Sequence, residues 1–488
     1  MPALDKRRHF GHRERIGPAE GVWLVWTEHL ALIYLLVEWS IRLVMLVVVP
    51  LRRPPEAARS WLLLVFFLPV PALVLYRLIG RSRFPAWRQQ RFAEAATLRR
   101  GVATSLPRPE RQAPGIAELA ERLGEFPVTG ASGLSLMSDY EVSIDSLASD
   151  IDEAETSVYL LTYIFADDTT GQKVAAALGR AARRGVDVRV LIDAVGSRPW
   201  VRGTLALLAA ESVPCKLALP VRWWTTVRRA RADLRNHRKI AVIDGRLAYV
   251  GSQNIVDRNF RRRVVNDELV ARVEGPVAAA VAAVFASDWY LETREALSLA
   301  PMPAAAVAPV QVMPSGPDYG VPGFERLLVA LIHAAKTQVT LVSPYLIPDE
   351  ALLAALQTAA YRGVTIDLIV SRVVDQRLVR LAQRSFYDEL MSMGVRIHRY
   401  RSHLLHAKHV SVDGRVGVIG SGNADLRSFM LNAEISLLLY EPAQVAELVA
   451  QQAKCMALSD RLDLQHWRRR PMAMRLAENL ARLVGPLL

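Results

Sequence analysis

The sequence contains HRKIAVIDGRLAYVGSQN at 237–254 and HAKHVSVDGRVGVIGSGN at 406–423, two stretches with the same pattern. Each places a lysine two residues after a histidine, follows with an apolar run around an Asp-Gly pair, and ends on Gly-Ser-x-Asn. The two histidines and the two final asparagines are both 169 positions apart. One such stretch is typical of a surface hairpin with an incidental histidine. Two equivalent copies indicate a duplicated unit that builds one site from two halves.

The residues before each copy repeat the same order of predicted elements: a β-rich run, an alanine-rich helix that ends at a glycine, and an apolar strand. In the first half these are 156–165, the helix closing at Gly185, and 186–193; in the second they are 337–347, the helix closing at Gly363, and 364–371. This spacing predicts a βαβ crossover with two parallel strands. We therefore predict an α/β fold in which two duplicated lobes, 101–300 and 301–488, pack as a pseudo-dimer around one active site.

The repeated residues suit phosphoryl transfer. A neutral imidazole can attack phosphorus and form a phosphohistidine, while a second, protonated imidazole gives its proton to the leaving alkoxide. Lysine ammonium groups and asparagine amides can hold the charged oxygens without a metal ion. In a hairpin, alternate residues share a face and the returning strand comes back to the same region. The predicted site contains His237, Lys239, Ser252 and Asn254 from one copy, and His406, Lys408, Ser421 and Asn423 from the other.

Two kinds of carboxylate accompany the histidines. Glu268 and Glu434 follow their histidines by 31 and 28 residues, each in an Asn-x-Glu on a predicted strand. We expect them to contact the ring nitrogen that does not react and so orient the imidazole; a solvated charge at a strand edge is the alternative. Asp244 and Asp413 each precede a glycine in a turn sequence, so we expect them to support the site rather than to carry protons.

The composition limits the kinds of binding partner that we expect. Lysine and arginine number 61 against 48 aspartate and glutamate, giving a formal net charge of +13, which favours nucleic acid or an anionic membrane surface as partner. Cys215 and Cys455 are the only cysteines and are far apart, which argues against a disulfide framework or a cysteine-based zinc site.

The N-terminal 100 residues indicate that the polyanionic partner is a membrane rather than nucleic acid. Leu30 to Val49 is largely apolar and has two charged residues, Glu38 and Arg42, which are spaced to pair on one helix face. Trp61 to Tyr76 has no charged residue. We predict a transmembrane hairpin over about 22–50 and 60–80, with an interfacial helix as the alternative for the first segment and a buried soluble helix for the second. Basic residues are concentrated before and after the hairpin rather than in its loop, which predicts that both ends are cytoplasmic.

The sequence allows two interpretations for each of two basic segments: a contact with lipid, or an ordinary structural role. Trp223 and Trp224 with Arg228, Arg229 and Arg231 suit a membrane interface, or form a solvated loop. The C-terminal HWRRRPMAMRLAENLARLVGPLL at 466–488 suits an amphipathic helix on lipid, or packs on the second lobe, which we favour.

The doubled H-x-K-x4-D and G-S-x-N pattern resembles the phospholipase D superfamily. Longer stretches, among them NHRKIAVIDGRLAYVGSQNIVDRNF, SPYLIPDEALLAALQTAAYRGV and WLLLVFFLPVPALVLYRLIGR, are similar to bacterial cardiolipin synthases, and the resemblance covers most of the chain. It implies two phospholipase D-type lobes. It also implies that His237, Lys239, Asn254, His406, Lys408 and Asn423 are catalytic, with Asp244 and Asp413 completing the motifs. Family analogy favours the first histidine as nucleophile, and the internal symmetry leaves the reverse open.

The resemblance implies that two phosphatidylglycerols give cardiolipin and glycerol, with no nucleotide cofactor. The implied partners are phosphatidylglycerol, other anionic phospholipids and the membrane, not nucleic acid. The implied location is the bacterial inner membrane, with a multi-pass anchor and a cytoplasmic catalytic domain. A phospholipase D-type hydrolase, or a transferase that uses another lipid such as phosphatidylethanolamine or another alcohol, is the alternative. A nuclease would not need the apolar hairpin.

Overall fold

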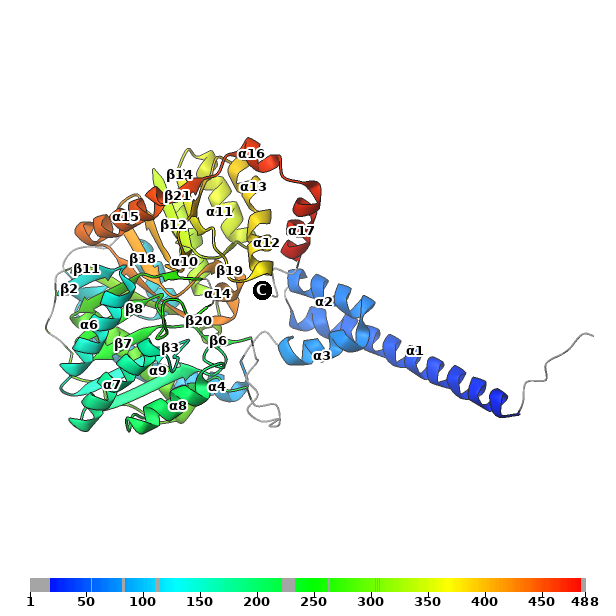
Figure 1. The fold of residues 1–488 in the computed structure, drawn as a ribbon, viewed down its shortest axis with the longest axis horizontal. Helices are drawn as coiled ribbons and strands as arrows, with labels where there is room; N and C mark the ends of the chain where they lie inside the picture. The colour runs from blue at the N-terminus through cyan, green and yellow to red at the C-terminus, as the bar shows by residue number, and fades with distance from the viewer. Residues whose placement is uncertain are drawn as a thin grey trace, which may run out of the picture. The chain divides into compact units, whose positions relative to one another are not determined.

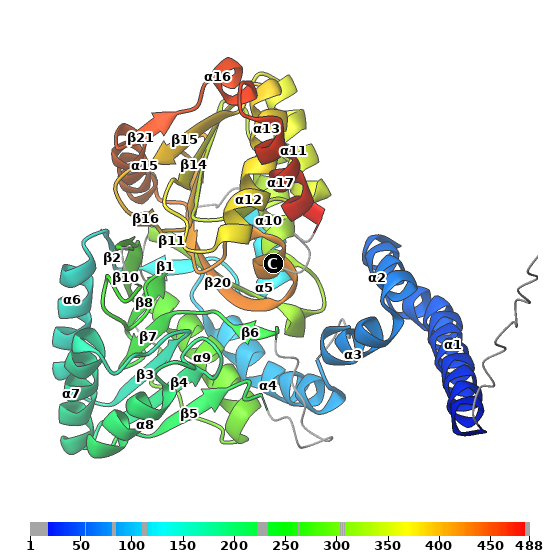
Figure 2. The same ribbon diagram turned by 45° about the vertical axis from the view of Figure 1, so that its right-hand side comes forward.

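The computed structural model describes residues 18–53, 55–80, 84–109, 115–221, 233–261, 264–302, 304, 306 and 308–483. The chain divides into two compact units, Met1–Ser82 and Arg83–Leu488. Figures 1 and 2 show the α-helical N-terminal unit in dark to medium blue and the larger unit in colours from light blue to red.

The N-terminal unit is a helical hairpin whose second arm is bent. It consists of α1 (Pro18–Arg52), α2 (Pro55–Phe67) and α3 (Pro69–Ile79). Within the described residues, one helical stretch, His29–Arg52, is long and apolar enough to cross a membrane, judged by length and composition. The predicted pair forms inside it, with Arg42 Nη2 3.1 Å from Glu38 Oε2. Met45 and Val49 of α1 pack against Trp61 and Tyr76 of the second arm.

The second arm differs from the single span expected over 60–80. The helix is interrupted at Leu68, because Pro69 and Pro71 have no N–H to donate and so cannot continue the hydrogen-bond ladder. The arm is therefore two helices of 13 and 11 residues, each shorter than the roughly 20 residues that a straight transmembrane helix needs.

The division between the units falls at residue 82, not at the boundary expected near 100. Helix α4 (Ala86–Ser105) belongs to the larger unit because it packs on α9 (Pro276–Thr293). Three of its arginines, Arg88, Arg91 and Arg99, are buried in this contact. Arg88 Nη1 is 2.8 Å from Glu292 Oε1, and Arg99 Nη1 donates to Ser287 Oγ at 2.7 Å. These arginines look like surface charge in the sequence, which placed α4 with the membrane segment.

The larger unit contains two sheets with the same strand order, as the duplication predicts. In the first, the order is β2-β10-β8-β7-β3-β4-β5; in the second, β11-β20-β18-β17-β12-β14-β15 repeats it, with β1 and β21 added at the edges. The first sheet comprises β2 (Gly133–Met137), β3 (Ser157–Thr162), β4 (Asp187–Asp193), β5 (Cys215–Ala218), β7 (Ile240–Ile243), β8 (Leu247–Gly251) and β10 (Val270–Glu274). The second comprises β1 (Thr129–Ala131), β11 (Ala308–Ser315), β12 (Gln338–Ser343), β14 (Thr365–Ser371), β15 (Arg396–Tyr400), β17 (His409–Val412), β18 (Val416–Gly420), β20 (Asn432–Leu439) and β21 (Ser459–Arg461).

The predicted βαβ crossovers are present in both lobes. Helix α7 (Thr169–Arg183) connects β3 to the parallel β4, and α11 (Glu350–Tyr361) connects β12 to the parallel β14. Gly185 and Gly363 follow these helices with φ of +90° and +84°, a left-handed conformation that glycine adopts without strain. The predicted hairpins are the antiparallel pairs β7–β8 and β17–β18.

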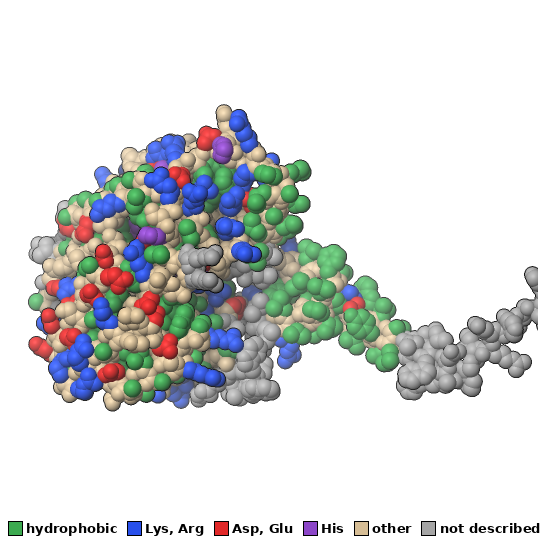
Figure 3. All heavy atoms as spheres, viewed as in Figure 1, with side chains coloured by type: hydrophobic (Ala, Val, Ile, Leu, Met, Phe, Trp, Pro, Cys, Tyr) green, Lys and Arg blue, Asp and Glu red, His purple; other side chains and the backbone are tan. Residues whose placement is uncertain are grey.

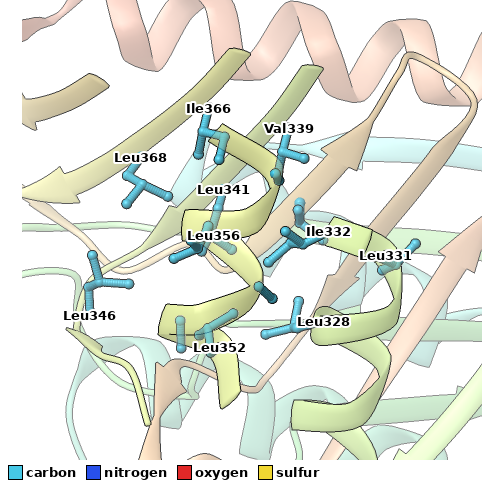
Figure 4. Close-up of a cluster of buried hydrophobic side chains, with 14 of the residues drawn as sticks. Leu328, Leu331, Ile332, Val339, Leu341, Leu346, Leu352, Leu356, Ile366 and Leu368 are labelled. Atoms are coloured by element: carbon cyan, nitrogen blue, oxygen red, sulfur yellow. The ribbon is translucent and has the colours of Figure 1, made fainter. Parts of the chain in front are cut away.

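The remaining helices cover the outer faces or lie between the sheets. They are α5 (Ile116–Gly124), α6 (Tyr140–Asp152), α8 (Val201–Ala210), α10 (Gly323–Ala334), α12 (Arg377–Ser385), α13 (Tyr387–Ser392), α14 (Leu426–Met430), α15 (Pro442–Ala457), α16 (Leu464–Arg468) and α17 (Met472–Leu483), with a 3₁₀ turn at Pro317–Tyr319. Figure 4 shows the outer core of the second lobe, where leucines of α10 and α11 pack on β12 and β14.

A central core joins the two lobes. Along β3, Val158 and Leu160 face the outer core with α6 and α7, whereas Tyr159 and Leu161 face the centre. The alanine-rich α9 is buried there, together with residues of β11, β20 and α15 from the second lobe. One apolar cluster therefore spans both copies, so the lobes have a shared core and not only a surface contact.

Both Asp-Gly turns are pinned by their aspartates. Asp244 and Asp413 have φ of +52°, and each carboxylate accepts backbone N–H groups at the start of the neighbouring strand. For Asp413 these donors are Lys336, Thr337 and Gln338, each at 2.8 Å. The turns lie at the end of each hairpin opposite to the histidines, so these aspartates hold the hairpin to the sheet.

We predict that Asp413→Ala lowers the free energy of unfolding by about 1–3 kcal/mol, because it removes a multiply bonded side chain from a left-handed position. Asp460→Ala is the matched control, because the Asp460 carboxylate contacts only the side chains of two exposed arginines among the ion pairs described. This substitution should lower the free energy of unfolding by less than about 0.5 kcal/mol. Thermal and urea unfolding of the purified protein measure both; equal losses would contradict the anchoring role.

Candidate active site

The histidine of each motif lies just before its hairpin rather than within the strand. His237 and Lys239 precede β7, which begins at Ile240, and His406 and Lys408 precede β17, which begins at His409. Each lysine turns back to its own histidine: Lys239 Nζ donates to the His237 carbonyl at 2.6 Å, and Lys408 makes the same bond to His406. The two motifs thus have the same local geometry.

Each motif is fixed to the opposite lobe by a short parallel strand pair. β6 (Arg235–Asn236), just before His237, pairs with Asn432 and Ala433 at the start of β20. β16 (Leu404–Leu405), just before His406, pairs with β9 (Asn266–Asp267). The main chain continues the pairing, since His237 N donates to Ala433 O at 2.9 Å and His406 N to Asp267 O at 2.7 Å.

This exchange places the carboxylate of each copy behind the imidazole of the other. His237 Nδ1 is 3.0 Å from both carboxylate oxygens of Glu434, and His406 Nδ1 is 2.8 and 2.9 Å from those of Glu268. From the sequence we associated each glutamate with the histidine of its own copy. In the structure each glutamate instead contacts the histidine of the other copy. The two predicted serines lie behind these carboxylates: Ser421 Oγ donates to Glu434, and Ser252 Oγ accepts from Leu269 N, beside Glu268.

The two histidines line one pocket. Its walls come from both lobes, and the space between them is about 910 Å³, open to solvent. Asn254 and Asn423 also line it, whereas the two lysines and the two serines lie behind it. Asn254 Oδ1 accepts the N–H of Ile164 at 3.1 Å, which leaves its amide nitrogen as a donor toward the pocket. The predicted His and Asn residues are thus brought together at a single cavity.

Burial and the crossed glutamates set the charge of the imidazoles. Burial lowers the pKa of His237 and of His406 to about 4, although the neighbouring glutamate acts in the opposite direction. Burial alone would raise the pKa of Glu434, but His237, Lys239 and the Ser421 hydroxyl bring it down to about 2. At neutral pH each ring is neutral and donates its Nδ1–H to an ionised carboxylate, so the Nε2 lone pair is free to react.

The two lysines share one electrostatic cluster with the glutamates. Burial lowers the pKa of Lys239 to about 7 and that of Lys408 to about 8, while Glu434 and Glu268 both act to raise them. Two ammonium groups and two carboxylates therefore balance behind the rings, and the pocket itself stays able to accept an anion.

Several pocket residues were missed by the sequence analysis. Arg427 and Arg261 line the cavity, together with Tyr163 and Tyr345 from the ends of β3 and β12. The Tyr163 ring meets the His237 ring edge to face, with centroids 4.8 Å apart. The repeat carried a signal for Arg427: an arginine follows the final asparagine by four residues in both copies, as Arg258 and Arg427.

Two further points concern the Trp/Arg run at 223–231 and metal binding. The run with Trp223, Trp224, Arg228, Arg229 and Arg231 lies outside the described residues. Within the described ranges, no group of three or more His, Cys, Asp or Glu side chains is placed to hold a metal ion.

Comparisons with known proteins identify relatives of this chain. The sequence matches the family described as "Cardiolipin synthase, PLD-like domain" over residues 147–289 and 328–456. It is 33% identical over 461 residues to cardiolipin synthase A of Pectobacterium carotovorum subsp. carotovorum (strain PC1), and equally to that of Yersinia pseudotuberculosis serotype O:1b (strain IP 31758). Each alignment covers 90% of this chain and 94% of the relative.

The fold is also similar to a solved structure. The crystal structure of phosphatidylserine synthase from Haemophilus influenzae Rd KW20 superposes with a TM-score of 0.57 and 14% sequence identity, covering 76% of this chain and all of that one. At this identity the likeness concerns the fold.

The crossed pairing predicts which histidine each glutamate controls. Because Glu434 raises the pKa of His237, Glu434→Gln should lower the pKa of His237 below its value of about 4 and leave that of His406 unchanged. Glu268→Gln should lower the pKa of His406 and leave that of His237 unchanged. Titration of ¹³C-labelled histidines by NMR, assigned with single His→Gln variants, measures both. A shift at His406 in Glu434→Gln would contradict the exchange.

Proposed function

We propose that this chain, which belongs to the family of cardiolipin synthases with a PLD-like domain, transfers a phosphatidyl group from one phosphatidylglycerol to another and releases glycerol. The observation that carries the proposal is the single pocket lined by two imidazoles, each held through Nδ1 by a carboxylate of the opposite lobe. Nucleophile and proton donor then flank one phosphodiester.

In the first step, Nε2 of one neutral histidine attacks the phosphorus of phosphatidylglycerol. A P–N bond forms, the bond from phosphorus to the headgroup glycerol oxygen breaks, and the other histidine gives its proton to that oxygen. Burial keeps this second imidazole neutral in the empty pocket, but a bound phosphodiester adds a negative charge that favours its protonated form. The crossed glutamate stabilises the resulting cation from behind.

In the second step, a terminal hydroxyl of a second phosphatidylglycerol enters where glycerol left. The proton-donating histidine, now neutral, takes the hydroxyl proton while the oxygen attacks phosphorus. The P–N bond breaks, the first histidine is regenerated, and cardiolipin is formed. Water in place of the alcohol would give phosphatidic acid instead, so the reaction class depends on which hydroxyl the pocket admits.

Positive and donor groups around the pocket suit the charged transition state. The amide nitrogen of Asn254 and the guanidinium group of Arg427 can contact the non-bridging oxygens directly, whereas the guanidinium of Arg261 is paired with the Asp375 carboxylate, which also lines the pocket. Lys239 and Lys408 act from behind the rings. This charge distribution supports the assignment of His237, Lys239, Asn254, His406, Lys408 and Asn423 as catalytic or phosphate-binding residues, with Ser252, Ser421, Asp244 and Asp413 as supports.

The partners and location follow from the same proposal. We place the substrates as phosphatidylglycerol and other anionic phospholipids, not nucleic acid, and the enzyme in the bacterial inner membrane. The apolar helix within α1 supports an N-terminal anchor, and the arginines on both sides of the hairpin support a cytoplasmic catalytic unit. We propose that the larger unit divides into its two lobes near residue 300, with α4 in the first lobe.

Purified protein given radiolabelled phosphatidylglycerol should produce cardiolipin and free glycerol in equal amounts. His237→Ala and His406→Ala should each abolish the product, because each removes one of two non-redundant roles. Exposed His333 offers a matched control, and His333→Ala should keep wild-type turnover. Thin-layer chromatography and mass spectrometry identify the products. Phosphatidic acid as the main product would favour a hydrolase, and near-normal turnover in either catalytic variant would refute the two-histidine site.

The lysine pKa values predict the alkaline limb of the pH profile. As pH rises through about 7 and then 8, Lys239 and Lys408 lose their charge, so kcat/KM should fall over this range. Lys239→Arg removes the lower of these titrations and should move the fall toward pH 8, at a reduced maximum rate. Exposed Lys336→Arg should leave the profile unchanged. An unshifted limb in Lys239→Arg would show that another group controls it.

A further inference from the structure

Helix α17 presents its apolar face to the outside and its charged residue to the protein. Glu478 and Ala481 are 1% and 4% exposed, whereas Met472, Leu476 and Leu480 are 85%, 59% and 55% exposed. At 100° per residue these three, with Leu483, share the face opposite Glu478 and Ala481. A surface helix of a soluble protein normally has the reverse arrangement. We call Met472, Leu476, Leu480 and Leu483 the outer face of α17.

Specific bonds fix this orientation. The Glu478 carboxylate accepts from Arg384 Nε of α12 at 2.7 Å and from Arg470 Nη1 at 2.5 Å. Arg482 is paired with Glu389 at 3.1 Å and lies over the Phe386 ring. Rotating α17 to bury its leucines would leave Glu478 without these partners. The outward apolar face is therefore a consequence of the ionic contacts that hold the helix.

The surroundings of the outer face are basic. Glu478, which is buried, is the only acidic residue from Leu464 to Leu483. Exposed arginines come from the same segment and from the neighbouring α12; they are Arg469, Arg475, Arg377 and Arg380, whereas the exposed Arg468 is paired with Asp388 at 2.9 Å. In Figure 3 the apolar side chains over α17 form a green patch with arginines beside it. Apolar side chains with flanking arginines are typical of a helix that lies in the headgroup region of an anionic membrane.

The outer face is also linked to the pocket. α12, which packs on α17 along its middle and end, contributes Val379 to the pocket wall, and Gln376 at its start lines the same cavity. The same helix also has an exposed apolar side chain, Leu378, at 51%. A lipid surface on α17 would thus lie beside the helix that forms part of the pocket wall.

We propose that the outer face of α17 inserts into the surface of an anionic phospholipid bilayer and holds the pocket at that surface. This contact is separate from the N-terminal apolar helix, and it extends the proposed function by naming how lipid is presented to the site. The sequence left this segment open between lipid and packing, with packing favoured. The structure accounts for both, since the polar face packs on α12 and the apolar face remains available.

Site-directed fluorescence in the full chain tests the contact without requiring turnover. An environment-sensitive fluorophore is attached to the cysteine of the Leu480→Cys variant. The labelled protein is placed in nanodiscs of phosphatidylglycerol and phosphatidylcholine, in which some acyl chains carry a nitroxide quencher. We expect blue-shifted emission and several-fold stronger quenching than for Val142→Cys on α6, a control site that is 54% exposed. Labelled parent protein, with Cys215 and Cys455, gives the background. Quenching should weaken in phosphatidylcholine alone and at high salt.

Other occupants give other results. A blue shift without lipid quenching would mean that protein, either the N-terminal helices or a second copy, covers the outer face, and an unshifted emission would mean that it faces water; both overturn the proposal. In the assay, Leu476→Asp with Leu480→Asp should lose activity several-fold on vesicles and keep it on short-chain monomeric phosphatidylglycerol, whereas Val142→Asp should change neither. Absence of any lipid product with normal quenching would refute the proposed function and leave the membrane contact standing.

Discussion

Each imidazole of the pocket is held from behind by a carboxylate that the other half of the chain supplies. Because His237 depends on Glu434 and His406 on Glu268, neither lobe contains a complete half-site of its own. Each contact is a buried hydrogen bond from a neutral imidazole to a charged carboxylate, and a hydrogen bond to a charged group typically contributes about 1.5–3 kcal/mol. The strand pairs β6–β20 and β16–β9 and the central core around α9 are the structural means of keeping these four side chains in register.

The same arrangement explains how a buried site can tolerate so many ionisable groups. Two glutamates and two lysines balance one another, and the imidazoles remain neutral because burial lowers their pKa. The cluster therefore carries little net charge until a ligand arrives. In the proposed reaction a phosphodiester contributes the missing negative charge, so that binding favours the protonation of one ring. Substrate binding and preparation of the general acid are then one electrostatic event.

Features set by local sequence were predictable, and features set by long-range contacts were not. The crossovers, hairpins and Asp-Gly turns follow from patterns within a few residues, and the shared pocket followed from the repeat. The crossed glutamates could not be foreseen, because His237 and Glu434 are 197 residues apart and nothing local distinguishes the two possible partners. The burial of Arg88 and Arg99 could not be foreseen for the same reason, since only α9 and its neighbours bury them. Pro69 and Pro71, by contrast, were visible signals for a bent second arm.

The internal symmetry is close at the rings and broken at the pocket wall. Both histidines have a pKa of about 4 and a glutamate at Nδ1, so intrinsic reactivity does not choose the nucleophile. The wall is different: Arg427 faces the cavity, whereas its counterpart Arg258 is bound to Asp267 and to the Asn266 carbonyl. Tyr163 likewise packs on His237 alone of the two rings among the described contacts. In the proposed transfer, the order of the two histidines is decided by where these unequal walls place the leaving glycerol.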